Sequence, residues 1–285
     1  MSSRSNFERV GLGLFFLLTV APVAASLSYA ALYGFGVVGL LSHGFTLEHW
    51  RLVLASAEAW ASVRLSLYVA TAVVLLTAVI ALPLALALRR HLESGPLAYV
   101  LTLPLAIPGT VGAVLALQLL SGAGLLSRLA FQLHLTSGIP DFPSLVHDPL
   151  AFGVIGTHVA LAVPFFAFLF VELFASERVG ALLELAASLG ARRAQRFFRV
   201  TLPILLRAAV PSLALLFALV LGSFEIPLLL GRQSPQMLSV LTYRKYALFD
   251  ITQKPEAYIL ALGYTALVLT LIALVFRGRD PGHER

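Results

Sequence analysis

The sequence predicts an all-α polytopic membrane protein with six transmembrane helices and a cytoplasmic loop between the fourth and fifth spans. Two observations predict this fold. First, 59% of the 285 residues are hydrophobic and only 12% are charged, whereas soluble domains carry about a quarter charged residues. Second, the apolar residues lie in long runs that leave little chain outside a bilayer. We therefore expect one transmembrane domain over residues 1–285.

Each apolar run is long enough to cross a membrane, because about 20 helical residues span a hydrocarbon core of about 30 Å. Arg89 and Arg90 close the second run, and Arg277 closes the last. Pro104 and Pro108 are expected to bend the third span. The predicted spans are 10–33, 63–88, 97–120, 152–174, 208–230 and 257–276.

The arginines predict the orientation, because Arg and Lys collect on the cytoplasmic side of membrane proteins. With both termini inside, the inner segments carry most of the Arg residues. We therefore expect a multi-pass protein of the bacterial inner membrane with both termini in the cytoplasm. On the outer side, Thr46 is expected to begin a short helix near Glu48 that lies along the membrane surface.

Composition excludes several classes of function. The chain has no cysteine, which excludes disulfides, thiolate catalysis and Cys-ligated metal. Neither of its lysines, Lys245 and Lys254, follows a glycine, so the sequence has no phosphate-binding P-loop. It also has no HExxH, no GxSxG and no basic stripe with interleaved aromatic residues, so we expect neither catalysis nor nucleic-acid binding. His158, inside the fourth span, is expected to be a packed, hydrogen-bonded residue.

The inner loop at 176–207 is the least lipid-like stretch of the chain. Its pattern predicts two short amphipathic helices joined at Gly190, which can take the positive φ that closes a helix. In the first helix, an apolar face recurs at helical spacing. The second helix carries arginines on one side and Phe197 and Phe198 on the other. Such a hairpin either docks to a partner or lies on the inner leaflet.

The spacing within this loop resembles the EAA signature of binding-protein-dependent ABC importer permeases of the MetI-like type I family. Glu184, Ala186, Gly190, Leu202 and Pro203 stand in register with that signature. Two positions depart from it: Leu185 replaces its first alanine, and Val200 its isoleucine. The six-span layout is similar to that of polyamine-, thiamine- and iron-type permeases.

The resemblance implies that the loop forms a coupling helix that seats in a groove of a cytoplasmic ATPase subunit. It implies a full machine of two ATP-binding subunits, a second permease subunit, similar or identical, and an extracytoplasmic solute-binding protein. ATP and Mg²⁺ would be held by the partner ATPase, and this chain would need no cofactor. The residues implied for ATPase docking are Glu184, Leu185, Ala186, Leu189, Gly190, Ala191 and Pro203.

Three polar residues are candidates for the translocation path. Glu225 falls in the predicted fifth span, and acidic residues within spans face the bundle or water. The alternative for Glu225 is a side chain that snorkels to the interface or pairs with Arg232. Ser223 and Gln118 are the weaker candidates.

The function expected from these features is the permease subunit of an ATP-driven ABC importer for a small polar or charged solute. Glu225 favours a cation, such as a polyamine or thiamine. The alternative is an ion-coupled secondary carrier, for which Glu225 and His158 are the only buried ionisable groups expected. An intramembrane enzyme is disfavoured by the missing catalytic motifs.

Overall fold

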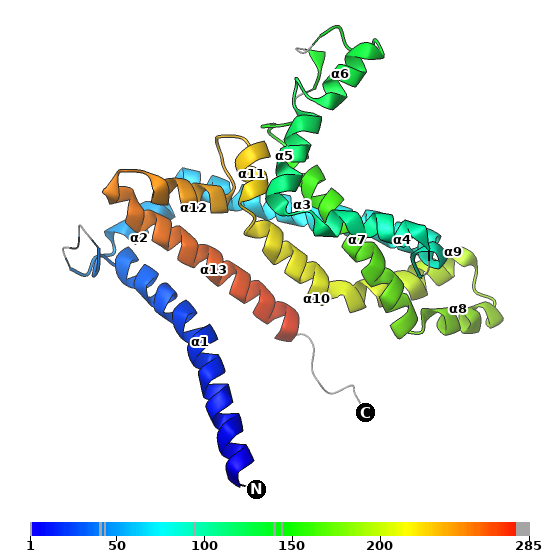
Figure 1. The fold of residues 1–285 in the computed structure, drawn as a ribbon, viewed down its shortest axis with the longest axis horizontal. Helices are drawn as coiled ribbons and strands as arrows, with labels where there is room; N and C mark the ends of the chain where they lie inside the picture. The colour runs from blue at the N-terminus through cyan, green and yellow to red at the C-terminus, as the bar shows by residue number, and fades with distance from the viewer. Residues whose placement is uncertain are drawn as a thin grey trace. The chain divides into compact units, whose positions relative to one another are not determined.

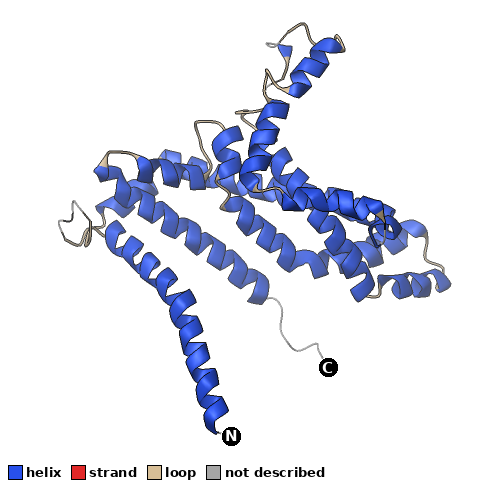
Figure 2. Cartoon of the chain, viewed as in Figure 1, coloured by secondary structure: helices blue, strands red, loops and turns tan. Residues whose placement is uncertain are grey.

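A computed structural model describes residues 2–39, 42, 44–93, 95–138, 141–143 and 145–277. Within these residues the chain is helical, with no strand, which confirms the predicted all-α class (Figure 2). The elements carry the labels of Figure 1: α1 (Ser2–Gly34), α2 (Glu48–Ala55), α3 (Ala57–Glu93), α4 (Pro96–Thr102), η1 (Leu103–Ala106), α5 (Gly109–Leu120), α6 (Leu125–Gln132), α7 (Phe152–Ser176), α8 (Val179–Ser188), α9 (Arg193–Arg196), η3 (Phe197–Thr201), α10 (Leu202–Leu221), α11 (Glu225–Leu230), α12 (Leu238–Ala247), η4 (Ile251–Gln253) and α13 (Lys254–Arg277).

The described residues contain 6 helical segments long and apolar enough to cross a membrane, as predicted. The third and fifth of these segments differ clearly from the predicted ranges. The segments are Val10–Gly34, Ala57–Leu92, Gly109–Gln132, Phe152–Ser176, Arg193–Leu221 and Ile251–Leu274.

The prediction of one bent third span over 97–120 is wrong. Helix α4 ends at Thr102, a single turn of 3₁₀-helix follows, and α5 begins anew at Gly109. Two prolines cause the break, since each lacks the N–H of a helical hydrogen bond. Pro108 also disfavours helical geometry at the preceding residue, and Ile107 is extended, with φ −84° and ψ 117°.

The fifth span is shifted toward the N-terminus. The predicted range was 208–230, but α10 begins at Leu202 and ends at Leu221, and α11 is a separate short helix. In an unbroken helix, Pro227 would leave the carbonyl of Ser223 without a hydrogen bond. The break falls at that point, so Pro227 occupies the first turn of α11, where an N–H has no helical partner in any case.

The chain forms two compact units, 1–61 with 238–267 and 62–237 with 268–285. In the second unit, α3, α7, α8 and α10 share a hydrophobic core. Phe170 and Leu205 are its largest fully buried side chains. The other buried members of this core are Ala81, Leu82, Ala85, Phe166, Val179 and Ala209.

The first unit is held by aromatic contacts and ion pairs. The ring of Tyr33 packs on that of Tyr258, with centroids 4.6 Å apart. Lys245 pairs with Glu256 at 2.8 Å, and Arg244 pairs with Glu58. Helix α2 of this unit confirms the expected short helix.

Candidate functional site

The loop between α7 and α10 has the predicted helix–glycine–helix form (Figure 1). Arg178 takes a left-handed conformation that ends α7 and redirects the chain into α8. Gly190, with φ +80°, turns it again before α9. A five-residue π-helical turn, Phe197–Thr201, then leads into α10. Pro203 lies in the first turn of α10, where a missing N–H costs little.

Gly190 is required for its backbone conformation and not for lack of space. The turn is closed by hydrogen bonds from the N–H of Gly190 to Ala187 O, 2.9 Å, and from the N–H of Ala191 to Ala186 O, 3.0 Å. Such bonds satisfy the last carbonyls of a helix when the following residue is left-handed. A Cβ at position 190 would meet nothing within 4 Å. The surface around Gly190 is therefore open to a partner.

The apolar face of α8 is exposed. Leu185 is 59% exposed, Leu189 80% and Leu182 39%. Glu184 is exposed on the same helix and Ala186 is half-buried. Exposed leucines at helical spacing are unfavourable in water and are typical of a surface that a partner covers.

The start of α8, by contrast, is buried. Val179 has no exposed surface and packs in the core that contains Phe170 and Leu205. Gly180 lies within reach of the Phe174 ring, since a Cβ there would be 3.8 Å from it. The guanidinium of Arg89, on α3, lies 4.2 Å from the centroid of the same ring. The start of α8 is therefore anchored in the core that α3, α7 and α10 also form.

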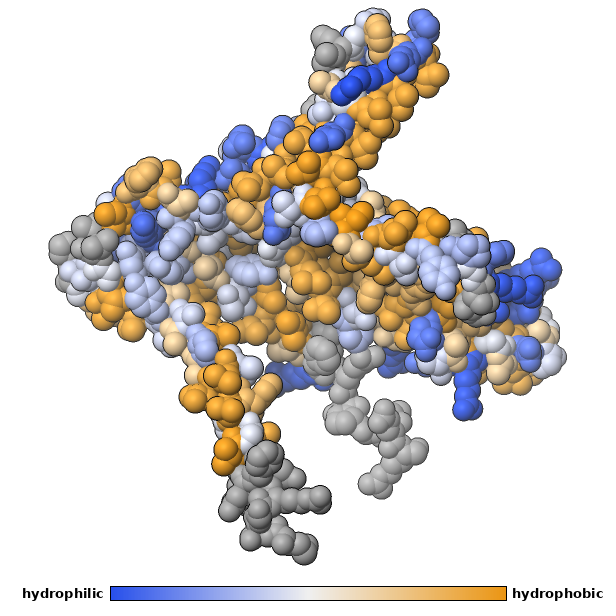
Figure 3. Space-filling model, viewed as in Figure 1, coloured by the Kyte–Doolittle hydropathy of each residue, from blue (hydrophilic) through white to orange (hydrophobic). Residues whose placement is uncertain are grey.

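The second half of the loop is basic and capped. The side chain of Gln195 accepts a hydrogen bond from the N–H of Arg192 at 2.8 Å, which closes the first turn of α9. Phe197 and Phe198 pack edge to face at 5.0 Å, and Phe198 is 64% exposed. Figure 3 shows hydrophilic residues gathered at the α8–α9 end of this unit. The basic residues of this half are Arg192, Arg193, Arg196 and Arg199.

The path candidates come from packed elements but do not form one site. Helix α11 packs against α5 and α7. Glu225 is exposed in the first turn of α11, where a carboxylate favours the helix dipole. Gln118 is exposed on α5, and Ser223 is half-buried in the break. Among the described residues no ion pair joins Glu225 to Arg232, so that predicted alternative is not observed.

The sequence prediction that Glu225 lies inside a continuous span is therefore wrong. The carboxylate stands at a helix start beyond the end of α10, because Pro227 breaks the helix. Its role in a path remains a prediction.

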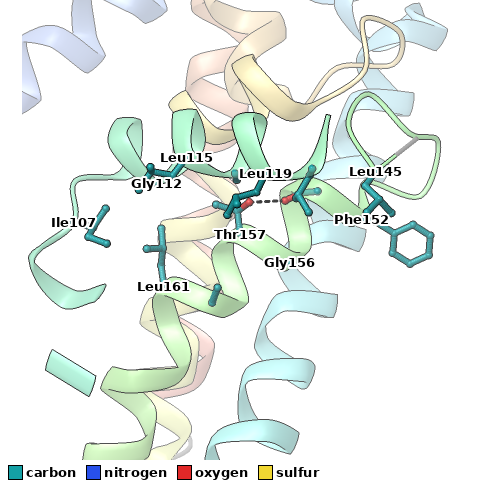
Figure 4. A pocket seen from close by; sticks show the side chains of 13 residues that line it. Ile107, Gly112, Leu115, Leu119, Leu145, Phe152, Gly156, Thr157 and Leu161 are labelled. Carbon is teal, nitrogen blue, oxygen red and sulfur yellow. Dashed lines mark hydrogen bonds between the residues drawn. The ribbon is translucent and has the colours of Figure 1, made fainter. Parts of the chain in front are cut away.

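A groove between α5 and α7 has a volume of about 400 Å³ (Figure 4). Thr157 is the one polar side chain among its lining residues, and its hydroxyl donates to Gly153 O at 2.7 Å. Among the described lining residues, the groove therefore offers a polar solute only the acceptor lone pairs of the Thr157 hydroxyl. Neither Glu225, Ser223 nor Gln118 lines it.

His158 is buried in α7, and its Nδ1 lies 2.8 Å from Val154 O. This confirms the expected packed, hydrogen-bonded histidine. Among the described residues, no group of three or more His, Cys, Asp or Glu side chains is arranged to hold a metal ion.

Two anchoring features were missed by sequence reasoning. Asp148 accepts hydrogen bonds from the N–H groups of Leu150 and Phe152, both at 3.0 Å, and so caps α7. His147 bonds through its N–H to Leu230 O, 2.8 Å, and through Nδ1 to Gly231 O, 2.7 Å. The dipeptide Asp148-Pro149 is a turn-initiating signal that could have placed the cap. The contact of His147 with α11 had no signal, because it joins residues far apart in sequence.

No protein-family model matches this sequence, and no curated protein matches it closely enough to be recognised as a relative. Solved structures do share its fold. A chain from a bacterial alginate ABC transporter, in complex with an alginate pentasaccharide-bound periplasmic protein, has a TM-score of 0.68 and 20% identity over 95% of this chain and 91% of that one. A chain from a bacterial ABC transporter involved in the import of the acidic polysaccharide alginate has a TM-score of 0.70 and 20% identity over 97% and 96%. This chain therefore has the fold of a chain found in bacterial ABC transporters.

Proposed function

We propose that this chain is the transmembrane permease subunit of an ATP-driven ABC importer in the bacterial inner membrane. It provides half of the path for a polar solute and is driven by an ATPase on a separate chain. Both termini lie in the cytoplasm. The pairing with a second permease and with two ATPase subunits, and the coupling role of the α8–α9 loop, belong to this proposal.

The observation that carries the proposal is the division of α8 into a buried start and an exposed end. Val179 is fully buried, whereas Leu185 and Leu189 are exposed in the segment that matches the importer signature. A helix held at one end by the core and bare at the other suits a lever that docks into a groove. The fold shared with ABC transporter chains supports the same function.

Glu184, Ala186, Gly190 and Ala191 complete the proposed docking surface around the leucines, and Pro203 sets the start of α10 behind it. The arginines of α9 and η3 are not part of this proposed contact, which rests on the exposed leucines of the α8 segment. ATP and Mg²⁺ remain on the partner, in line with the absence of a P-loop here.

For the solute, a saccharide ranks above a small cation. The transporter of similar fold is described as one that imports an acidic polysaccharide. The cation depended on Glu225, whose exposed place at a helix start has an ordinary structural explanation. A small cation such as a polyamine or thiamine is the second choice. Comparing the uptake of a labelled oligosaccharide with that of a labelled polyamine distinguishes a saccharide importer from a cation importer.

Co-purification tests the docking. The chain is expressed with the candidate ATPase and isolated from mild detergent. Leu189→Ser should lower the amount of bound ATPase about tenfold, since a buried leucine side chain contributes about 1.5–3 kcal/mol. Leu135→Ser, at another strongly exposed leucine (74%), is the matched control and should leave the complex intact. Equal recovery of the ATPase with the unsubstituted chain, Leu189→Ser and Leu135→Ser would contradict the proposal. Solute uptake driven by an ion gradient in the absence of ATP would also contradict it.

Thiol labelling tests the orientation, since the chain has no cysteine of its own. Ser137→Cys and Ser188→Cys each place a single thiol at an exposed site. A membrane-impermeant maleimide should label the first variant in spheroplasts and the second only after permeabilisation. The opposite pattern would overturn the proposed topology.

A further inference from the structure

A second polar site lies in the first unit, at the end of α1. It is a pocket of about 260 Å³ formed by the end of α1 and the turn after it, the start of α2, η4 and the start of α13. No residue of the α3–α7–α10 core lines it. The polar side chains of its lining are those of Tyr33, Thr46, Glu48, His49 and Thr252.

Specific backbone contacts fix the turn that lines the pocket. Gly39, with φ +124°, crosses the ring of Tyr33 so closely that a Cβ would lie 2.7 Å from it. The N–H of Thr46 donates to Phe35 O at 2.8 Å, which closes the turn. The hydroxyl of Thr46 then accepts from the N–H of Glu48 at 3.1 Å. Together these contacts fix the walls on the α1 side.

The charge of the pocket is unbalanced. Glu48, exposed in the first turn of α2, lines it, and no Lys or Arg is among the described lining residues. Two other glutamates of this unit, Glu58 and Glu256, are paired with Arg244 and Lys245. Lys254, close by in sequence, has its ammonium 5.5 Å from the centroid of the Tyr246 ring. Within the described part of the chain, Glu48 has no ion-pair partner.

The neighbouring imidazole strengthens this preference. His49 lines the same pocket, is half-buried, and makes no hydrogen bond among the described residues. A neutral imidazole and a carboxylate both accept hydrogen bonds. The pocket thus offers a carboxylate beside a further acceptor, the combination that suits an ammonium or guanidinium group.

The proposed topology places the pocket on the extracytoplasmic side of the membrane. Its residues come after the first span and before the sixth, whereas the α8–α9 loop comes after the fourth span. The pocket and the docking loop then face opposite sides of the membrane. The assignment of the pocket to the extracytoplasmic side rests on the proposed function.

We propose that this pocket receives the side chain of an Arg or Lys residue from an extracytoplasmic partner protein, with Glu48 as the counter-charge. A fixed side chain fits better than a transported solute, because the pocket is lined by one unit and includes none of the residues of the transmembrane core.

Binding can be measured on the intact chain in lipid nanodiscs without any partner. The chain has 2 tryptophans, and Trp50 follows His49 and stacks on Phe35 at 5.2 Å. Trp60→Phe leaves Trp50 as the sole reporter. Titration with N-acetyl-arginine amide should change its fluorescence saturably in the millimolar range. N-acetyl-citrulline amide, the uncharged isostere, should bind about tenfold more weakly.

Glu48→Gln in the Trp60→Phe background should remove most of the preference for arginine over citrulline. Glu177→Gln, which removes an exposed carboxylate at the end of α7, is the control and should retain it. Equal binding of arginine and citrulline derivatives, no saturable signal, or an unchanged preference in Glu48→Gln would each overturn the charge recognition. Agmatine bound at least tenfold more tightly than the blocked arginine would overturn the assignment to a side chain and favour a free amine.

This titration needs no ATPase and no transport. If Leu189→Ser bound as much ATPase as the unsubstituted chain, the assignment of the pocket to the extracytoplasmic side would lose its support, but the binding of arginine would not. If the titration showed no binding, the proposal for the pocket would be wrong, but the importer function would be unaffected.

Discussion

Helices α8 and α11 follow breaks in neighbouring spans, yet their burial is opposite. The ten residues of α8 have one buried member, Val179, whereas the six residues of α11 have three, Ile226, Pro227 and Leu230. In α8, Leu182 and Leu185 are exposed, while Leu183 packs against the core. In α11, Ile226 and Leu230 are buried, while Leu228 and the charged Glu225 are exposed.

This difference separates an apolar surface that we propose a partner covers from a piece of the protein's own core. Both helices are apolar in sequence, so composition does not distinguish them. Burial does, because an exposed leucine gains stability only when something else covers it. Substitutions in α11 should therefore affect folding, and substitutions in α8 should affect assembly.

The largest effect is expected for Leu230→Ala in α11. Leu230 is 1% exposed, and removal of a buried leucine costs about 2–5 kcal/mol through lost burial and a cavity. Thermal unfolding in detergent should show a clearly lower Tm. Leu185→Ala, its counterpart in α8, should change the free energy of unfolding by less than about 0.5 kcal/mol. Similar losses for both would erase the distinction between the two helices.

Gly190→Asp should come next and should act on transport more than on folding, because Asp tolerates the left-handed backbone of position 190 (φ +80°) better than most residues. A carboxylate placed at a docking surface must be desolvated without a partner, and such a penalty is about 2–5 kcal/mol at interfaces. ATP-dependent uptake in proteoliposomes should fall at least about tenfold while Tm changes little. Gly180→Ala, within α8 itself and with room for its Cβ, should behave as the unsubstituted protein. Normal uptake by Gly190→Asp would remove the coupling role.

A smaller effect is expected for Phe174→Leu, which removes the aromatic ring beneath Arg89. The loss of a cation–π contact costs about 0.5–1 kcal/mol, and leucine conserves most of the apolar volume. The Tm should fall slightly, and the ATPase should still co-purify. A loss of ATPase binding without a change in Tm would mean that Phe174 belongs to the docking surface and not to the tether behind it.

The smallest effect is expected for Glu225→Gln. An exposed glutamate in the first turn of a short helix contributes about 0.3–1 kcal/mol through the helix dipole. If Glu225 meets a cationic solute, Glu225→Gln should raise the KM for uptake of a polyamine more than the KM for uptake of a saccharide, with kcat nearly constant. An equal change in the two KM values would exclude Glu225 from solute recognition.

Sequence reasoning predicted the helical class, the number of spans and the helix–glycine–helix form of the inner loop. Those features depend on local properties: the length of apolar runs, the positive φ that glycine permits, and the position of Thr46 ahead of α2. It failed at the third and fifth spans. Hydropathy does not detect the helix breaks near Pro108 and Pro227, because proline is compatible with an apolar run. The helix breaks there because each proline removes a backbone hydrogen bond.

The proposed docking residues were predicted from their spacing, and the structure adds the exposure of Glu184, Leu185 and Leu189. Val179, Asp148 and His147 were not found. Each acts through a contact with a distant element or with backbone groups of a turn, and such contacts leave no periodic pattern. The pocket at Glu48 escaped detection for the same reason, since its walls come from segments about two hundred residues apart.

The sequence by itself determined that this protein is a bundle of apolar helices with a basic, glycine-broken loop, because solvent preference and helix propensity act on neighbouring residues. Only the tertiary structure decided which apolar face is left bare. Leu189 and Leu230 are the same residue type in similar helices, but one is 80% exposed and the other 1%. The packing of α5 and α7 against α11, and the lack of a comparable cover over Leu189 among the described residues, made that choice.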